Sequence, residues 1–137
     1  MHVPVRADYA IRAVTELARR GEPTKCRDIA HAQEIPLKFL VNILSDLRRA
    51  RFVRSQRGAD GGYWLVREAT ELSLAEVMEA VLGPLTTVAG ELPQDLKYSN
   101  ENAGLRDVWL ALDERVRGLL GSVTIADLAS GAPVVPR

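Results

Sequence analysis

Between residues 36 and 66 the spacing of the apolar residues changes from the spacing of a helix to that of two short strands. Four apolar side chains after Pro36 share one helix face, at i, i+3, i+4 and i+7: Leu40, Ile43, Leu44 and Leu47. Two short β-prone runs follow, Phe52–Gln56 and Tyr63–Val66, and the segment between them holds Asp60-Gly61-Gly62. Such runs around an Asp-Gly-Gly turn are typical of a hairpin. The sequence therefore predicts a buried helix that leads directly into a two-stranded hairpin.

Helices are predicted on both sides of this unit. The first segment carries an apolar stripe of six side chains: Tyr9, Ala10, Ala13, Val14, Leu17 and Ala18. A second helix is predicted over about residues 26–33 with Thr24 as its N-cap, and a fourth from the cap Ser73 to the stop at Gly83-Pro84. Three helices followed by a hairpin form the layout of a winged helix-turn-helix. We therefore expect a mainly α fold with a small β-hairpin, and this domain over residues 1–84.

The C-terminal part of the chain is predicted to form a long helix outside this domain. Residues 85–104 lack a clean period and are expected to be a loop, and residues 105–129 to hold the long helix and a short terminal helix before a tail. The long helix carries an apolar stripe of six side chains: Leu105, Val108, Trp109, Leu112, Val116 and Leu119. Such a stripe needs a partner surface, so it predicts a homodimer through this helix. The alternative is that the stripe packs wholly within its own chain.

A formal net charge of zero conceals two halves of opposite sign. Residues 1–70 carry 13 lysines and arginines against 8 acidic residues, and residues 71–137 carry 5 against 10. The densest stretch runs from Arg48 to Arg57, with five arginines and no acidic residue. This charge is typical of a domain that binds a polyanion such as DNA.

The outward face of the predicted third helix carries hydrogen-bonding groups and no carboxylate. Four of its residues are predicted to contact base edges in a major groove, Val41 through a thymine methyl group: Lys38, Val41, Asn42 and Ser45. Four arginines are predicted to contact phosphates: Arg48, Arg49, Arg54 and Arg57. Arg57 is also placed to enter a minor groove. Gly58, Gly61 and Gly62 are expected to shape the wing and let it approach DNA closely.

The chain resembles the Rrf-two family of bacterial winged helix-turn-helix repressors, which includes iron–sulfur, nitric-oxide and cysteine-metabolism regulators. The resemblance rests on Asp8-Tyr9-Ala10, on Asp28-Ile29-Ala30 and above all on the segment Val53–Leu65, with its Arg-Gly and Gly-Gly-Tyr. It is strong over residues 1–84 and looser over residues 105–129. The resemblance implies a homodimeric DNA-binding repressor of a partly palindromic operator, with the long helices paired across the two-fold axis.

The sequence departs from many members of that family in the loop where they hold an iron–sulfur cluster through three cysteines. The corresponding segment, Leu85–Gly104, contains no cysteine, and thiolates are the chief ligands of such clusters. Asp8 and His31 lie where some members place a carboxylate or a histidine ligand, but we interpret both as helix-surface residues. We therefore expect no metal and no cofactor.

The single cysteine, Cys26, has two interpretations. The first is a small buried hydrophobe. The second is a redox-sensing thiol whose pKa would be lowered by Lys25, Arg27 and the helix N-terminus. A redox sensor is thus one alternative function for the chain.

Two further alternatives concern partners. The acidic C-terminal half would let the chain act as a protein-interaction module that docks an enzyme or another regulator, and a small-molecule effector would bind between the winged domain and the long helix.

No residue pattern indicates a nucleophile with its base, a phosphate loop or a zinc site, so we expect no enzymatic activity. We expect a cytoplasmic protein without a membrane partner, because no apolar run approaches the roughly 18 residues of a membrane helix and the segment Met1–Arg6 lacks a signal core.

Overall fold

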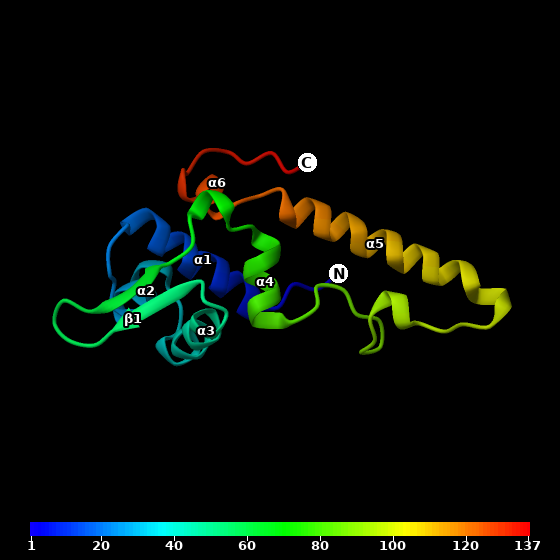
Figure 1. Ribbon diagram of the computed structural model, residues 1–137, viewed down its shortest axis with the longest axis horizontal. Coiled ribbons are helices and arrows are strands. Elements are labelled where there is room, and N and C mark those ends of the chain that lie inside the picture. The colour runs from blue at the N-terminus through cyan, green and yellow to red at the C-terminus, as the bar shows by residue number, and fades with distance from the viewer.

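The computed structural model describes residues 1–137, and its elements form a winged domain from which one long helix projects (Figure 1). The α-helices and strands follow in this order: α1 (Val5–Arg20), α2 (Cys26–Gln33), α3 (Leu37–Arg49), β1 (Val53–Gln56), β2 (Gly62–Leu65), α4 (Leu74–Leu82), α5 (Ala103–Gly121) and α6 (Ile125–Ala129). Three short 3-10 turns complete them: η1 (Ala69–Glu71), η2 (Pro93–Asp95) and η3 (Asn100–Asn102). The predicted mainly α winged helix-turn-helix with a small hairpin is confirmed. No helix of the structure joins enough length to enough apolar character to cross a membrane.

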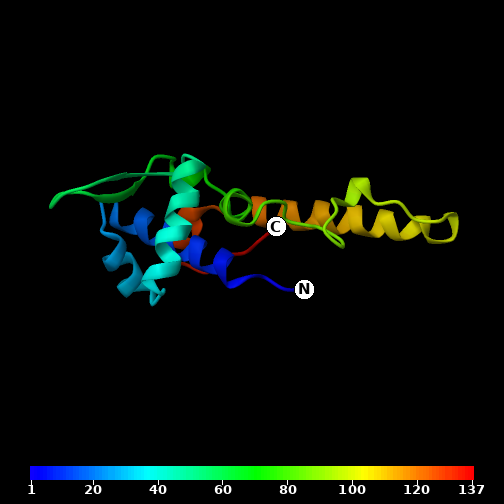
Figure 2. The same cartoon turned by 90° about the horizontal axis from the view of Figure 1, so that it is seen from below.

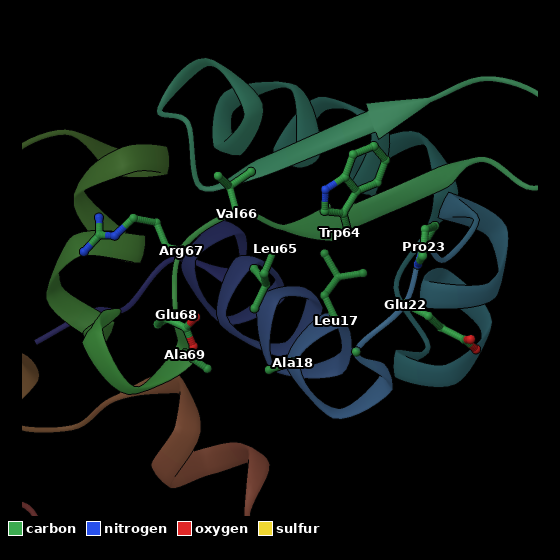
Figure 3. A pocket seen from close by; sticks show the side chains of 11 residues that line it. Leu17, Ala18, Glu22, Pro23, Trp64, Leu65, Val66, Arg67, Glu68 and Ala69 are labelled. Carbon is green, nitrogen blue, oxygen red and sulfur yellow. The ribbon is translucent and has the colours of Figure 1, made fainter.

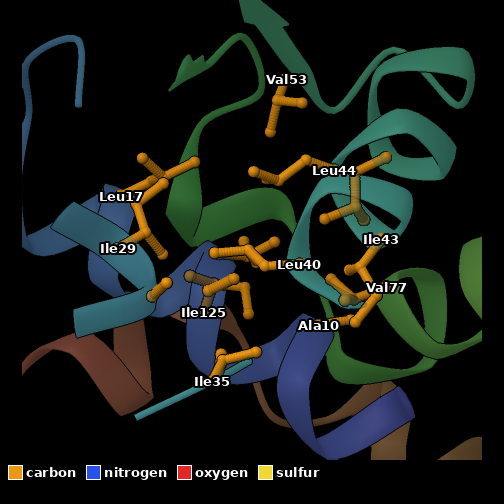
Figure 4. Close-up of a cluster of buried hydrophobic side chains, with 14 of the residues drawn as sticks. Ala10, Leu17, Ile29, Ile35, Leu40, Ile43, Leu44, Val53, Val77 and Ile125 are labelled. Carbon is orange, nitrogen blue, oxygen red and sulfur yellow. The ribbon is translucent and has the colours of Figure 1, made fainter. Parts of the chain in front are cut away.

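The core of the winged domain forms around α1, whose inward face includes several alanines. Ala10 and Ala13 are fully buried, so neighbouring helices can approach its backbone closely. The stripe predicted on the third helix lies in the same cluster: Leu40, Ile43, Leu44 and Leu47 (Figure 4). This arrangement directs the opposite face of α3 away from the core.

The terminal helix α6 belongs to the same core although it follows the long helix in the chain. Ile125 is fully buried beside residues of α1 and α3 (Figure 4). Its backbone N–H donates to Leu72 O at 2.8 Å, and the Leu74 N–H donates to Val123 O at 3.0 Å. The chain therefore leaves the winged domain after α4, returns to it along α5 and ends its last helix, α6, in the core (Figure 1).

The hairpin pairs Val53 with Leu65 and Gln56 with Gly62. Thr24 lies along the other edge of β2, where it exchanges two backbone hydrogen bonds with Tyr63, at 2.9 and 2.8 Å. The prediction that Thr24 caps α2 is therefore wrong: Lys25 is the N-cap, and the Thr24 hydroxyl donates to Glu22 O at 3.0 Å. Pairing with β2 keeps the backbone of Thr24 extended, and the helix begins one residue later than a Thr24 cap would require.

Helix α3 ends in a Schellman turn whose left-handed position is held by an arginine. Arg51 has a φ of 67°, its N–H donates to Arg48 O at 2.9 Å, and the Phe52 N–H donates to Leu47 O at 3.0 Å. Glycine is the usual residue at this position, because a side chain there costs on the order of 1 kcal/mol. The turn leads at once into β1, so α3 and the hairpin are joined by a short turn with two backbone hydrogen bonds.

Helix α4 has the predicted start and stop. The Ser73 hydroxyl accepts from the Glu76 N–H and the Glu76 carboxylate accepts from the Ser73 N–H, which is a capping box. The Ser73 N–H holds the pKa of Glu76 below its usual range. The helix ends at Gly83, which has a φ of 84°.

Helix α5 projects from the winged domain and runs back towards it alongside residues 85–102, which lead the chain outward (Figures 1 and 2). This segment, expected to be a plain loop, contains the turns η2 and η3. It is tied to α5 by two bonds: the Trp109 indole N–H donates to the Tyr98 hydroxyl at 3.0 Å, and Arg106 Nη2 donates to Gln94 O at 2.8 Å. The segment covers one side of α5 only.

Candidate nucleic-acid interface

The outward face of α3 is open to solvent and carries no carboxylate. Lys38, Val41 and Asn42 are exposed, and Ser45 is half-buried further along the helix. The nearest acid, Asp46, is turned aside, since its carboxylate pairs with Arg6 of α1 and with Arg49 Nη1 at 3.0 Å. The four residues predicted to contact bases thus share one accessible surface that can donate to, accept from and touch base edges.

The arginines after this face differ in their partners. Arg49 is the one that pairs with a carboxylate, and its side chain is 75% exposed, so the pair adds little stability. Arg48 Nη1 donates to Ser55 Oγ on β1 at 3.1 Å. Arg54 and Arg57 are exposed and form no ion pair. The hairpin and the end of α3, which lie side by side (Figure 2), therefore carry positive charge that the protein itself does not neutralise.

The three wing glycines do not share the role predicted for them. Gly58 is exposed at the tip with a φ of 108° and open space around it, as close approach to a ligand requires. Gly61 and Gly62 are buried. A Cβ on Gly61 would lie 2.1 Å from Gln56 O, and one on Gly62 would lie 2.6 Å from the Thr24 backbone. Gly61 and Gly62 therefore shape the wing by letting it close on itself and on the Thr24 segment.

Lys25 contributes to the wing in a way that sequence reasoning missed. Its ammonium group donates to the carbonyl of Gly58 at the tip of the hairpin. This bond and the Thr24–Tyr63 pairing attach the wing to the start of α2. No local pattern could have revealed it, because the two residues are 33 positions apart.

The apolar stripe of α5 lies where a partner could reach it. No residue of α5 is fully buried. Leu105, Val108 and Leu119 are 40%, 56% and 45% exposed, while Trp109, Leu112 and Val116 are half-buried. Half of the six side chains of the stripe are therefore exposed in this chain.

Cys26 lies half-buried at the start of α2 and packs against the core. Burial raises the pKa of its thiol above the usual range. This direction is opposite to the one a redox-sensing thiol requires, and the ammonium of Lys25 is bound to Gly58. The position fits a small hydrophobe.

The donor residues of this chain do not fit an iron–sulfur cluster. Cys26 is the only thiol, and no three His, Cys, Asp or Glu side chains lie close enough together to hold a metal ion. Asp8 is exposed and pairs with Arg12 Nε at 3.1 Å, and His31 is exposed on α2. Both lie on helix surfaces, and neither is near a thiolate ligand set.

Two of the hollows in the structure lie where a small-molecule effector would be considered. The space between α4 and α5, about 530 Å³, is mostly polar, and Arg117 there already pairs with Asp113 at 3.0 Å and with Glu79 at 3.3 Å. An open groove of about 510 Å³ lies between the end of α1 and β2, where Leu17, Leu65 and Trp64 line it (Figure 3). Neither hollow contains a convergent set of free polar groups that would select a small molecule.

Comparison with known proteins gives consistent matches along the whole chain. The family model Rrf2, described as an iron-dependent transcriptional regulator, matches residues 4–131. An HTH-type transcriptional regulator of Mycobacterium tuberculosis is 46% identical, over 96% of this chain and 83% of that protein. The HTH-type transcriptional regulator CymR of Bacillus subtilis is 32% identical, over 95% of this chain and 91% of that protein.

Solved structures agree with these matches. The structure of CymR, described as the global cysteine regulator of B. subtilis, has a TM-score of 0.81 at 27% identity, and the match covers 97% of this chain and 99% of that one. The structure of T. potens IscR has a TM-score of 0.78 at 26% identity, covering 97% and 89%. Similarity therefore extends over the winged domain and the long helix together.

Proposed function

The chain belongs to the Rrf2 family of transcriptional regulators, the Rrf-two family of the sequence resemblance, and from this premise we propose that it is a homodimeric, sequence-specific DNA-binding repressor. Each protomer inserts α3 into a major groove and lays its wing on the adjacent backbone. The operator is partly palindromic, since a two-fold symmetric dimer presents the same surface twice. The function requires no iron–sulfur cluster.

One observation supports this proposal above the others. The exposed face of α3 and the adjoining hairpin carry donors and cations, and Lys38, Arg48, Arg54 and Arg57 form no ion pair. Unpaired cations on an exposed element of major-groove width are suited to a phosphate backbone. The protein-interaction alternative does not explain this face, because that alternative rests on the acidic C-terminal half of the chain.

The roles within this surface follow from side-chain chemistry. Asn42 is suited to adenine, Lys38 to guanine, Ser45 to either, and Val41 to a thymine methyl group. Arg48, Arg49, Arg54 and Arg57 contact phosphates, which position the protein without selecting sequence. Gly58 lets the wing tip approach the backbone. Pairing of the α5 stripes sets the two α3 helices roughly 34 Å apart, one turn of DNA.

The direct test is DNA binding by the purified protein at several salt concentrations. We expect binding to random duplex DNA that weakens steeply as salt rises, and tighter binding to a sequence selected from a random pool. A protein-interaction module would show no DNA binding at physiological salt. That result would overturn the proposal.

Removal of one wing charge should change the salt dependence. Arg57→Ala is expected to weaken binding to every DNA and to reduce the slope of log K against log salt by about one unit, because one phosphate contact is lost. Arg137→Ala is the matched control, since it removes an exposed arginine from the C-terminal tail. A slope for Arg57→Ala equal to that of the control would remove Arg57 from the interface.

Removal of one base-reading group should change specificity instead. Asn42→Ala is expected to cost about 1–3 kcal/mol on the selected site and little on random DNA, because only the selected site offers a matching base edge. Asn100→Ala serves as the control, since Asn100 is exposed in η3, outside the winged domain. Equal losses on both DNAs in titrations of Asn42→Ala would show that Asn42 does not read bases.

A further inference from the structure

Three arginines that form no ion pair line one hollow where α3 meets the hairpin. The hollow has a volume of about 380 Å³ and is bounded by Arg48, Arg51, Val53, Arg54 and Val66, with no carboxylate among them. Arg48 comes from the last turn of α3, Arg51 from the connecting turn and Arg54 from β1. Three guanidinium groups that share one hollow repel each other until an anion enters.

The hollow is built on rigid backbone. Arg48 Nη1 donates to Ser55 Oγ at 3.1 Å, which holds this guanidinium against β1. Arg51 is fixed by the two backbone hydrogen bonds of the Schellman turn, from its own N–H and from that of Phe52. The backbone of the hollow and the Arg48 side chain are therefore in place before any ligand arrives, which lowers the entropic cost of binding.

Arg51 also has a left-handed backbone conformation, in which a residue with a Cβ atom is sterically strained. Its φ of 67° is left-handed, and glycine at this position would remove the strain. Strained residues of this kind cluster at functional sites, which makes the Arg51 side chain a candidate ligand-binding group. Neutralising the helix dipole is not a sufficient task, because Arg48 and Arg49 already lie in the last turn of α3.

We propose that this hollow binds a phosphate group and that Arg51 completes it. Guanidinium groups recognise phosphate oxygens through paired N–H donors, and here three of them come from three consecutive elements. The phosphate comes either from the DNA backbone beside the α3 contact or from a free phosphorylated anion. The first source rests on the proposed DNA-binding function, and the second does not.

The DNA arm of the test uses variants of Arg51 in the full chain. Arg51→Gly removes the charge and relieves the strained backbone, so the variant should be at least as stable as the wild type in thermal unfolding. We expect its slope of log K against log salt to be smaller than that of the wild type by about one unit. Arg51→Lys keeps the charge and should keep the slope, as should the control Arg137→Ala.

The second arm measures thermal unfolding without DNA, in sodium phosphate and in sodium chloride of equal ionic strength. Binding of a free anion would raise the Tm of the wild type more than that of Arg51→Gly. Non-specific stabilisation by phosphate would raise the Tm of both proteins equally.

The two arms distinguish a DNA phosphate from a free anion, and they distinguish failure of this inference from failure of the proposed function. A smaller slope for Arg51→Gly supports a backbone phosphate in the hollow, and a phosphate-dependent difference in Tm supports a free anion. An unchanged slope together with equal Tm shifts would overturn the inference, while wild-type DNA binding would leave the proposed function intact. Absence of salt-sensitive DNA binding by the wild type would overturn the proposed function, and the Tm arm would then decide the inference alone.

Discussion

Val108→Glu should convert the dimer to a monomer and lower the affinity for a two-half-site operator by about 10²–10⁴-fold. The affinity of a dimer for such a site exceeds that of one winged domain because the second domain binds as an intramolecular step. Val108 is 56% exposed on the apolar stripe of α5, so a charge there leaves the monomer intact and would be buried only against a partner. Light scattering after size-exclusion chromatography and operator titration measure the two effects.

Gly118→Glu is the matched control for this experiment. Gly118 lies on the same helix, is exposed, and has open space where a side chain would begin. On an α-helix it points away from the stripe, at about 100° per residue. We expect this variant to remain a dimer with unchanged affinity. If Val108→Glu behaved in the same way, the stripe would not be the dimer interface.

Gly62→Ala should destabilise the winged domain by about 3 kcal/mol through two independent effects. The φ of Gly62 is 138°, a conformation that an L-residue adopts only under strain, and a Cβ there would lie 2.6 Å from the Thr24 backbone. Relief of the contact would break the two hydrogen bonds that join Thr24 to Tyr63. Urea denaturation of the purified variant measures the change in the free energy of unfolding.

The control Gly58→Ala isolates the backbone effect. Gly58 has a φ of 108°, but no atom lies within 4 Å of the position that a Cβ would take, so we expect a loss of about 1 kcal/mol. A wild-type stability for Gly62→Ala, combined with weaker DNA binding, would show that Gly62 faces the DNA and not the Thr24 segment.

Much of the winged domain could be read from local patterns. The stripe from Leu40 to Leu47 predicts α3 and its buried face, because a period of 3.6 residues defines which side of a helix meets the core. The capping residue Ser73 and the stop at Gly83 define α4 through hydrogen bonds between neighbours in the chain. The same helical geometry places Lys38, Asn42 and Ser45 on one outward face. Each of these features depends on residues that lie within about two helical turns of each other in the chain.

Other features depend on contacts between distant segments, which no local pattern contains. Thr24 has the composition of a helix cap, but β2 draws its backbone into a strand pairing, and the same pairing turns Gly62 into a packing residue. Ile125 closes a core whose other members all lie between Ala10 and Val77. Arg51 is one of the five arginines between residues 48 and 57, and only the turn that follows α3 brings it into a hollow with Arg48 and Arg54. Secondary structure and the two faces of α3 follow from short-range periodicity, whereas the roles of the wing glycines and of Arg51 arise when the packed chain brings distant backbone together.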